Sequence, residues 1–220
     1  MSESLYAQLI GLFGGVLLLS AVLIVWRRSI SAEVRLLAVQ GGALGGLVVV
    51  LGVREQSLEL LAVAGIVLTL KAFVLPMLLS RAVARHGASL REETPLINTT
   101  TSLIALSLLT MLAFLVSRPL LVLGDNPAIA AVPIGIALVL HGFLVLATRR
   151  HAFSQLIGFL VLDNGIATVA FLTAAGIPLV VELGASLDLL LVVLILQVLT
   201  ARIRTEFGDA DLDDLTELRD

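Results

Sequence analysis

Four ionisable side chains lie deep within long apolar stretches of this chain. Lys71, the only lysine, lies near the middle of the apolar run Leu58–Ser80, Asp163 and Asp188 lie close to the centres of two later runs, and His141 lies in an earlier one. An Asp, Lys or Arg at the centre of a membrane helix costs about 2.5 to 3.5 kcal/mol on insertion scales, so such groups usually face the bundle interior and mark ion or proton paths. The pattern predicts that protons move between buried titratable groups.

A static ion pair of Lys71 with Asp163 or Asp188 is the alternative interpretation, in which the charges only fix the packing of helices. One lysine, however, cannot neutralise both acids. The second carboxylate is then expected to be partly protonated, because burial in a low dielectric disfavours the charged form. For His141, a hydrogen bond to a neighbouring helix explains the position as well as proton transfer does.

These side chains are carried by seven apolar stretches, each long enough to cross a bilayer. The chain has 220 residues, 59% hydrophobic and 14% charged, whereas soluble proteins are about 45 to 50% apolar and about 25% charged. A spanning helix uses about 20 apolar residues, and backbone polar groups in hydrocarbon must be satisfied within the segment. We therefore predict an all-α polytopic membrane bundle with the spans Leu5–Trp26, Leu36–Val53, Leu58–Ser80, Leu96–Val116, Ala128–Thr148, Ala152–Ala175 and Ile177–Ala201.

Composition also excludes several kinds of chemistry. The chain contains no cysteine, which removes disulfides, thiolate zinc sites, iron–sulfur clusters and covalently attached c-type haem. Its net charge of -3 gives no reason to expect a nucleic-acid partner. Seven spans leave almost no residues for a catalytic domain outside the bilayer. We expect no cofactor, no metal and no catalytic activity from the chain by itself.

The arginines are distributed unevenly between alternate connections. Eleven fall on one side of the predicted bundle and two, Arg54 and Arg118, on the other. Because cytoplasmic loops carry the excess of Lys and Arg, the amino terminus is predicted outside and the carboxyl terminus in the cytoplasm. We divide the chain into a transmembrane bundle, residues 1–205, and an acidic cytoplasmic tail, residues 206–220, whose regularly spaced leucines are expected to dock on a neighbouring subunit.

Residues near the buried acids predict local irregularity and close packing. Asn164 and Gly165 follow Asp163 directly and disfavour a regular helix, which predicts a bend or a local opening. Glu182 lies near the outer end of the seventh span, about one and a half turns before Asp188, and is expected to exchange protons there or to be a solvated cap. Small residues let helices approach closely, so a contact surface is predicted for the second span at Gly41, Gly42, Gly45 and Gly46.

Four stretches occur in an order and spacing that are together fairly specific. They are E-Q-S-L-E-L-L-A-V-A-G-I-V-L-T-L-K-A-F-V-L-P at Glu55–Pro76, R-R-H-A-F-S-Q-L-I-G-F-L-V-L-D-N-G at Arg149–Gly165, V-E-L-G-A-S-L-D at Val181–Asp188, and the ending D-L-D-D-L-T-E-L-R. With these, the chain resembles component E of the hydrogenase-4 and formate-hydrogenlyase type membrane complexes. The carboxyl-terminal part, residues 128–205, also resembles subunit K of respiratory complex I and the C subunit of multisubunit sodium/proton antiporters.

The resemblance implies a non-redox membrane-arm subunit of a complex I-like or group 4 hydrogenase-type respiratory complex, in the cytoplasmic (inner) membrane of a prokaryote. It implies antiporter-like and other membrane subunits as partners, with buried acids and a lysine contributing to proton or sodium translocation. In this resemblance Lys71 matches the lysine of the family's third helix, and Asp163 is similar to the acid of component E. Asp188 falls close to the second buried glutamate of subunit K, while Leu160 replaces the first. The alternative is a purely structural anchor for the assembly of antiporter-like subunits.

Overall fold

A computed structural model describes residues 1–27, 29–85, 97–121, 126–150 and 152–173 of the chain. Every regular element in these ranges is a helix, and six helical segments there are long and apolar enough to cross a membrane. The predicted all-α polytopic membrane bundle is therefore confirmed. The chain divides into two compact units between Gly184 and Ala185, and the described residues all belong to the first.

The membrane-spanning segments follow the apolar stretches of the sequence closely. Six of the seven predicted spans coincide with described helices, although the second helix begins at Ile30, ahead of the predicted start at Leu36. The seventh predicted span, residues 177–201, and the acidic tail, residues 206–220, lie outside the described residues. The elements are α1 (Glu3–Trp26), α2 (Ile30–Glu55), α3 (Leu58–Val67), the π-helix η1 (Leu68–Val74), α4 (Leu75–Arg85), α5 (Thr99–Val116), α6 (Arg118–Leu121), α7 (Pro127–Thr148) and α8 (Ala152–Thr173).

Polar side chains directly before the helices explain where these begin. Ser57 accepts a hydrogen bond from the Leu60 amide at the start of α3, and Asn98 accepts one from the Thr101 amide at the start of α5. Asn126 caps α7 in the same way, with Pro127 in the first turn. Such side-chain acceptors satisfy amides that have no partner in the first turn of a helix. The starts of these three helices are thus local properties of the sequence.

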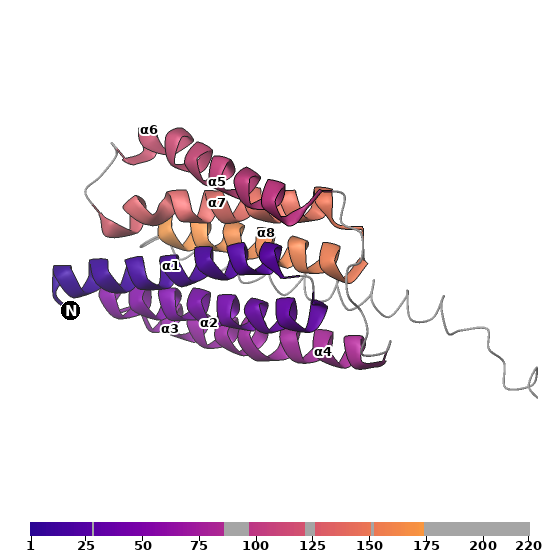
Figure 1. Cartoon of the computed structure of the whole chain (residues 1–220). Helices are drawn as coiled ribbons and strands as arrows, with labels where there is room; N and C mark the ends of the chain where they lie inside the picture. The colour runs from indigo at the N-terminus through magenta and orange to yellow at the C-terminus, as the bar shows by residue number, and fades with distance from the viewer. Residues whose placement is uncertain (28, 86–96, 122–125, 151, 174–220) are drawn as a thin grey trace, which may run out of the picture. The chain divides into compact units, whose positions relative to one another are not determined.

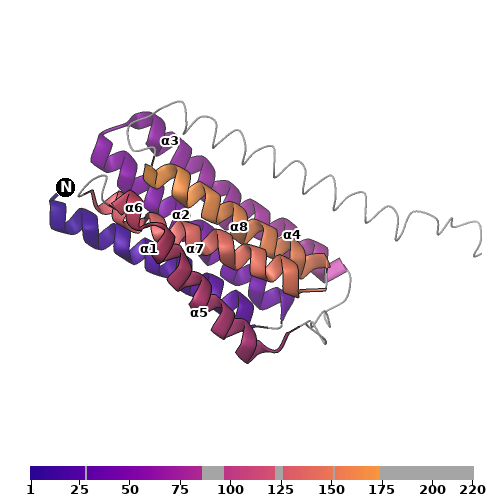
Figure 2. The same cartoon turned by 90° about the horizontal axis from the view of Figure 1, so that it is seen from above.

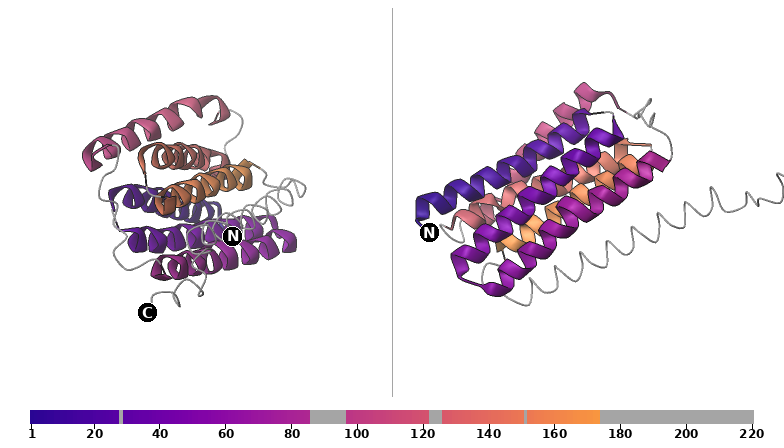
Figure 3. Two further views of the ribbon diagram at one scale, coloured as in Figure 1. Left: turned by 90° about the vertical axis from the view of Figure 1, so that its right-hand side faces the viewer. Right: turned by 90° about the horizontal axis from the view of Figure 1, so that it is seen from below.

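The helices of this unit are packed around two hairpins. α7 and α8 form one hairpin and α1 and α2 the other, and the hairpins meet where α1 contacts α7 and α2 contacts α8. On one side α5 covers α7 and α1, and on the other the third span, α3 to α4, covers α2 (Figures 1 and 2). Figure 3 shows the same order of helices along the bundle axis and from below. α2 and α8 are the most buried of the described spans.

The third span changes its hydrogen-bond pattern at its centre. Between α3 and α4 the chain forms the π-helix η1, and the Leu75 amide bonds to the Leu70 carbonyl five residues back. Pro76 follows immediately and has no amide, and in an α-helix its ring would clash with the carbonyl four residues before it. The wider turn before the proline relieves that clash. Lys71 lies within η1, and π-helical turns are frequent at functional sites.

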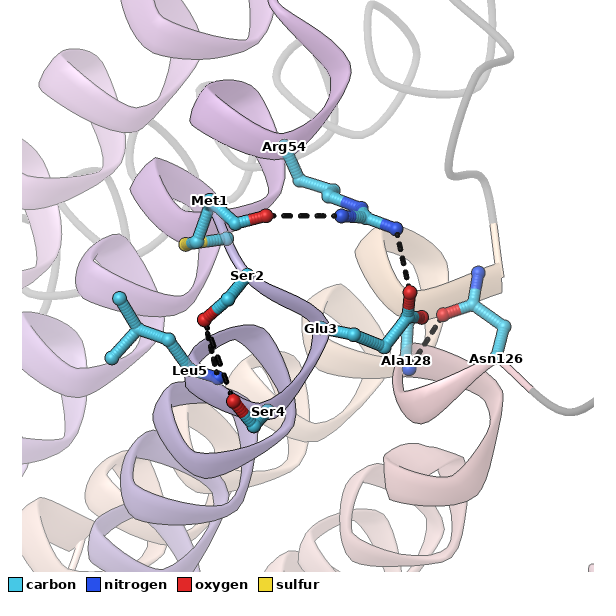
Figure 4. Close-up of polar contacts among 8 residues, drawn as sticks. All are labelled: Met1, Ser2, Glu3, Ser4, Leu5, Arg54, Asn126 and Ala128. Carbon is cyan, nitrogen blue, oxygen red and sulfur yellow. Dashed lines mark hydrogen bonds and ion pairs between the residues drawn. The ribbon is translucent and has the colours of Figure 1, made fainter.

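The amino-terminal end of the chain is tied to the end of α2. Arg54 donates to the Met1 carbonyl oxygen at 3.4 Å and pairs with the Glu3 carboxylate at 3.5 Å, as Figure 4 shows. The Arg54 guanidinium also lies 5.2 Å from the centre of the Tyr6 ring. These groups mark the end of the bundle that carries few arginines. Which side of the membrane this end faces stays a prediction.

Candidate functional site

The centre of the site is an ion pair between the third span and α8. The Lys71 ammonium, on η1, lies 2.6 Å from the Asp163 carboxylate oxygen Oδ2. Lys71 is 5% exposed and Asp163 6% exposed. The structure therefore brings together two of the residues that the sequence singled out, and among the described residues Asp163 is an acid that pairs with the lysine.

A chain of amide groups extends from this pair to two further helices. The Lys71 ammonium donates to Asn164 Oδ1 at 3.0 Å, and Asn164 Nδ2 donates to Gln40 Oε1 at 2.9 Å. Gln40 Nε2 then donates to the Leu17 carbonyl oxygen at 3.2 Å, and the same carbonyl accepts from the Ser20 hydroxyl at 2.8 Å. Gln40 is on α2 and Leu17 on α1, so one hydrogen-bonded network joins four membrane spans.

Glycines allow α2 to approach the π-helical turn closely enough for this network. A methyl group at Gly41 would overlap the backbone carbonyl of Lys71, and one at Gly45 would overlap the side chain of Leu68. The predicted helix contact at the glycine cluster of the second span is therefore confirmed. Because Gly41 directly follows Gln40, the same contact holds the Gln40 amide at the depth of Lys71.

The glycines of the α7–α8 hairpin explain why α8 is regular where the sequence predicted a bend. A methyl group at Gly165 would overlap the Val139 amide nitrogen of α7, so this glycine serves close packing instead of a turn. The Asn164 side chain is bonded to Lys71 and Gln40 and does not compete for its own backbone. α8 accordingly continues without a break to Thr173, and the irregular turn lies opposite it, at Lys71.

His141 lies at the same depth as the ion pair but faces a different helix. Its neighbour Gly142 packs against the backbone of Leu162, which precedes Asp163, while the His141 ring is directed to α5. Ring nitrogen Nε2 lies 2.9 Å from the Thr110 hydroxyl and 3.3 Å from the Leu106 carbonyl oxygen. The carbonyl can only accept, so we assign the ring hydrogen to Nε2. His141 is completely buried, and its Nδ1 has no hydrogen-bond partner among the described residues.

Two predicted site residues cannot be placed. Asp188 and Glu182 lie outside the described residues. Their proposed roles in proton transfer therefore stay predictions. Among the described residues, no group of three or more His, Cys, Asp or Glu side chains is placed to hold a metal ion.

Sequence reasoning missed two buried polar residues on α2. Gln40 has no exposed surface and Glu33 is 1% exposed. Both fall on the helical face that also carries Leu37 and Leu44, spaced by three or four residues. That spacing was a usable signal, because polar residues that share a face with buried leucines are expected to be buried with them. Arg149, counted in a connection between spans, is likewise 6% exposed.

Comparison with known proteins gives two levels of similarity. The chain is 51% identical to the uncharacterized protein Rv0085 of Mycobacterium tuberculosis over 220 residues, the full length of both proteins. It is 25% identical over 151 residues to hydrogenase-4 component E of Escherichia coli K12, which covers 68% of each chain, and the component E of Shigella flexneri gives the same values. No family model and no solved structure matches the chain. The resemblance to component E is thus confirmed as a distant relationship, and the one to subunit K stays a prediction.

Proposed function

The chain belongs to one family with the uncharacterized protein Rv0085 of Mycobacterium tuberculosis, and we propose that it is a membrane subunit of a hydrogenase-type complex in which it takes part in proton translocation. The distant relationship to hydrogenase-4 component E and the six apolar helices support the first part. The buried ion pair supports the second. Antiporter-like subunits as neighbours, the prokaryotic inner membrane and the likeness to complex I belong to the same proposal.

The single observation that carries the proposal is the contact between Lys71 and Asp163 in the interior of the bundle. At 2.6 Å, one proton that passes from the Lys71 ammonium to Asp163 Oδ2 converts a charged pair into a neutral pair without moving either helix. Two charges at such a distance in a low-dielectric interior interact strongly, so a change of charge nearby shifts the protonation of both. Titration of the pair can therefore be driven from a neighbouring subunit.

The amides beside the pair have a positioning role. Asn164 and Gln40 are neutral groups that neither bind nor release protons under physiological conditions. Their bonds fix the Lys71 ammonium beside Asp163 and supply an acceptor that remains when the carboxylate is protonated.

The permanent presence of a lysine also favours the proton over sodium as the transported ion, because an ammonium repels a second cation.

A purely structural anchor is the second candidate function, and one observation favours it. The network from Lys71 to the Leu17 carbonyl joins η1, α8, α2 and α1, which holds four spans in one arrangement. Removing one partner of a buried ion pair costs about 3 to 5 kcal/mol, so variants of this network lose stability whether or not it transfers protons. Stability and transport therefore have to be measured separately.

Isolation of the assembly tests the first part of the proposal. The full chain, tagged and expressed in its native host, is purified from membranes in mild detergent. We expect it to retain further membrane subunits and redox subunits that contain iron, with nickel if the module is a hydrogenase. A chain that purifies only with copies of itself and contains no redox metal would overturn this assignment.

The variant Asp163→Asn tests the second part in the intact complex. Proton uptake is followed with a pH-sensitive dye in membrane vesicles, and electron transfer through the complex is measured in the same vesicles. We expect electron transfer to continue while the dye response is lost, because Asn has no titratable proton. Glu59→Gln is the control, since Glu59 is an exposed acid at the start of α3. A normal dye response from an assembled Asp163→Asn complex would reject the transport role.

A further inference from the structure

A second buried ion pair joins the first turn of α2 to Arg149, the residue that ends α7 shortly before α8 begins. The Glu33 carboxylate on α2 lies 3.9 Å from the Arg149 guanidinium and accepts a hydrogen bond from the Ser154 hydroxyl at 3.4 Å. Arg149 also donates to the Val25 and Arg27 carbonyl oxygens, at 2.9 and 3.1 Å, at the end of α1. The cluster is at the end of the bundle where α1 and α7 finish and α2 and α8 begin.

The two buried clusters lie on one continuous seam between α2 and α8. On α2 the face is formed by Glu33, Leu37 and Gln40, spaced by four and three residues. On α8 it is formed by residues spaced by three, four and three, all buried: Ser154, Ile157, Val161 and Asn164. Hydrogen bonds join the two helices at both ends of the seam, from Ser154 to Glu33 and from Asn164 to Gln40. Only apolar side chains occupy these faces between the two bonds.

We infer that Glu33 is the titratable group through which the Lys71–Asp163 pair exchanges protons with the arginine-rich end of the bundle, and that the apolar layer at Leu37, Ile157 and Val161 is the barrier between them. This inference rests on the proposed function. It adds a residue and a direction to the same path: from Glu33, along the α2–α8 seam, to the ion pair at the centre of the membrane.

The chemistry of the cluster assigns the exchange to Glu33 and not to its neighbours. Arg149 stays protonated in proteins, so it balances charge but transfers no proton. Glu33 is the fourth residue of α2, where the positive end of the helix dipole and the arginine both stabilise its carboxylate. Ser154 can pass a proton along because its hydroxyl both donates and accepts. Glu33 is thus the group of this cluster that can both bind and release a proton, and Arg149 balances its charge once the proton has left.

The length of the apolar layer suits a path that opens only when water enters. Gln40 follows Glu33 by seven positions, which is about 10.5 Å along a helix. Hydrogen-bonded waters lie about 2.8 Å apart, so about three of them would connect the clusters. With Leu37 and Val161 buried between the two bonds, the closed state interrupts the path. A small separation of α2 and α8 would let water enter this layer and complete the path.

Glu33→Gln in the intact complex is the first test. The substitution keeps the size of the side chain and an acceptor for Ser154 but removes the titratable proton. We expect assembly and electron transfer to persist and proton uptake to be lost, with Glu59→Gln as the control. Normal proton uptake by Glu33→Gln, measured beside an inactive Asp163→Asn, would overturn this inference and leave the proposed function standing. Normal uptake by both variants would reject both.

Opening the barrier is the second test, and it does not depend on electron transfer. The full chain is reconstituted in phospholipid vesicles containing a pH-sensitive dye, and proton leak is measured after an acid pulse in the presence of valinomycin. Leu37→Gln is expected to raise the rate of proton leak about tenfold, equivalent to about 1.4 kcal/mol in the barrier. The double variant Leu37→Gln with Glu33→Gln is expected to leak at the original rate.

Leu44→Gln provides the matched control for this leak, because Leu44 is a fully buried leucine of the same face of α2 but lies beyond Gln40. It is expected to leave the leak unchanged. A leak in Leu37→Gln that persists without the Glu33 carboxyl group, or that appears equally in Leu44→Gln, would show a general loss of packing and would overturn the inference.

Discussion

The ion pair on η1 and α8 and the histidine on α7 occupy the same depth in the bundle and have opposite surroundings. Lys71 and Asp163 carry opposite charges 2.6 Å apart and are joined by amides to α2 and α1. His141 instead bonds to one neighbouring helix, through the Thr110 hydroxyl and the Leu106 carbonyl oxygen. The π-helical turn and the close approach of Gly41 on α2 lie beside the ion pair, whereas the glycine next to His141, Gly142, packs against α8.

The difference shows that a titratable residue in an apolar stretch is an ambiguous sign of function. In both places the cost of burial forces the polar group to find a partner. At His141 an ordinary hydroxyl and a backbone carbonyl on α5 provide it. At Lys71 the partner is itself titratable, so proton transfer within the pair leaves no net charge. Proton transfer is therefore proposed for the pair, and the His141 site is expected to contribute packing.

The largest effect on stability is expected from removing one charge of the pair. Lys71→Met leaves Asp163 without its counter-charge in the bundle interior, which should lower the free energy of unfolding by about 3 to 5 kcal/mol. Thermal unfolding of the full chain in lipid nanodiscs, followed by circular dichroism, measures this. The control Arg81→Met removes an exposed charge on the same span and should change it by less than about 0.5 kcal/mol. Equal melting temperatures for the two variants would contradict the view that the pair is strongly coupled.

Replacing both charges separates stability from transport. Apolar replacement of a complete buried pair is often neutral or stabilising by about 1 to 4 kcal/mol. The double variant Lys71→Met with Asp163→Leu should therefore recover most of the stability that Lys71→Met loses, while proton uptake by the complex stays absent. Unfolding and dye measurements on the same preparation check both expectations. Full proton uptake by this variant would show that the Lys71–Asp163 pair is not needed for transport, which leaves the structural anchor as its role.

A moderate effect is expected from the contact between α2 and η1. A methyl group at Gly41 overlaps the Lys71 backbone, so Gly41→Ala should force the helices apart and cost about 1 to 3 kcal/mol. At Gly42 the nearest atom, Cβ of Ala72, is an ordinary 3.9 Å away, so Gly42→Ala should instead stabilise the helix by about 0.5 to 1 kcal/mol. Melting temperatures that move in the same direction for both variants would show that close approach is unimportant here.

The smallest effect is expected at the histidine. Thr110→Val removes one hydrogen bond to His141 and should cost about 1 kcal/mol. Proton uptake should remain normal. Thr173→Val, which removes an exposed hydroxyl bonded only to its own helix, is the control for the loss of a hydroxyl from a span. Loss of proton uptake in Thr110→Val alone would bring the His141 site into the path and remove the contrast between the two regions.

Much of the fold was predictable because its physical causes are local. A helix in hydrocarbon must satisfy its own backbone, so a long apolar run is sufficient to predict a span. Side-chain caps such as Asn98 and Asn126 act within two or three residues of their own positions. The hydroxyls of Thr168 and Thr173 likewise bond within their own helix, to carbonyl oxygens of α8.

The sequence by itself determined that the chain is a membrane bundle and that Lys71 must find a partner, because the cost of an isolated charge in hydrocarbon does not depend on the arrangement of helices. Only the tertiary structure decided that Asp163 lies beside Lys71, that Gln40 and Glu33 are buried beside α8, and that the irregular turn falls at Lys71. The physical reason is that those outcomes depend on contacts between segments remote in sequence. Such contacts are set by which faces pack together, and a single chain read from end to end does not specify them.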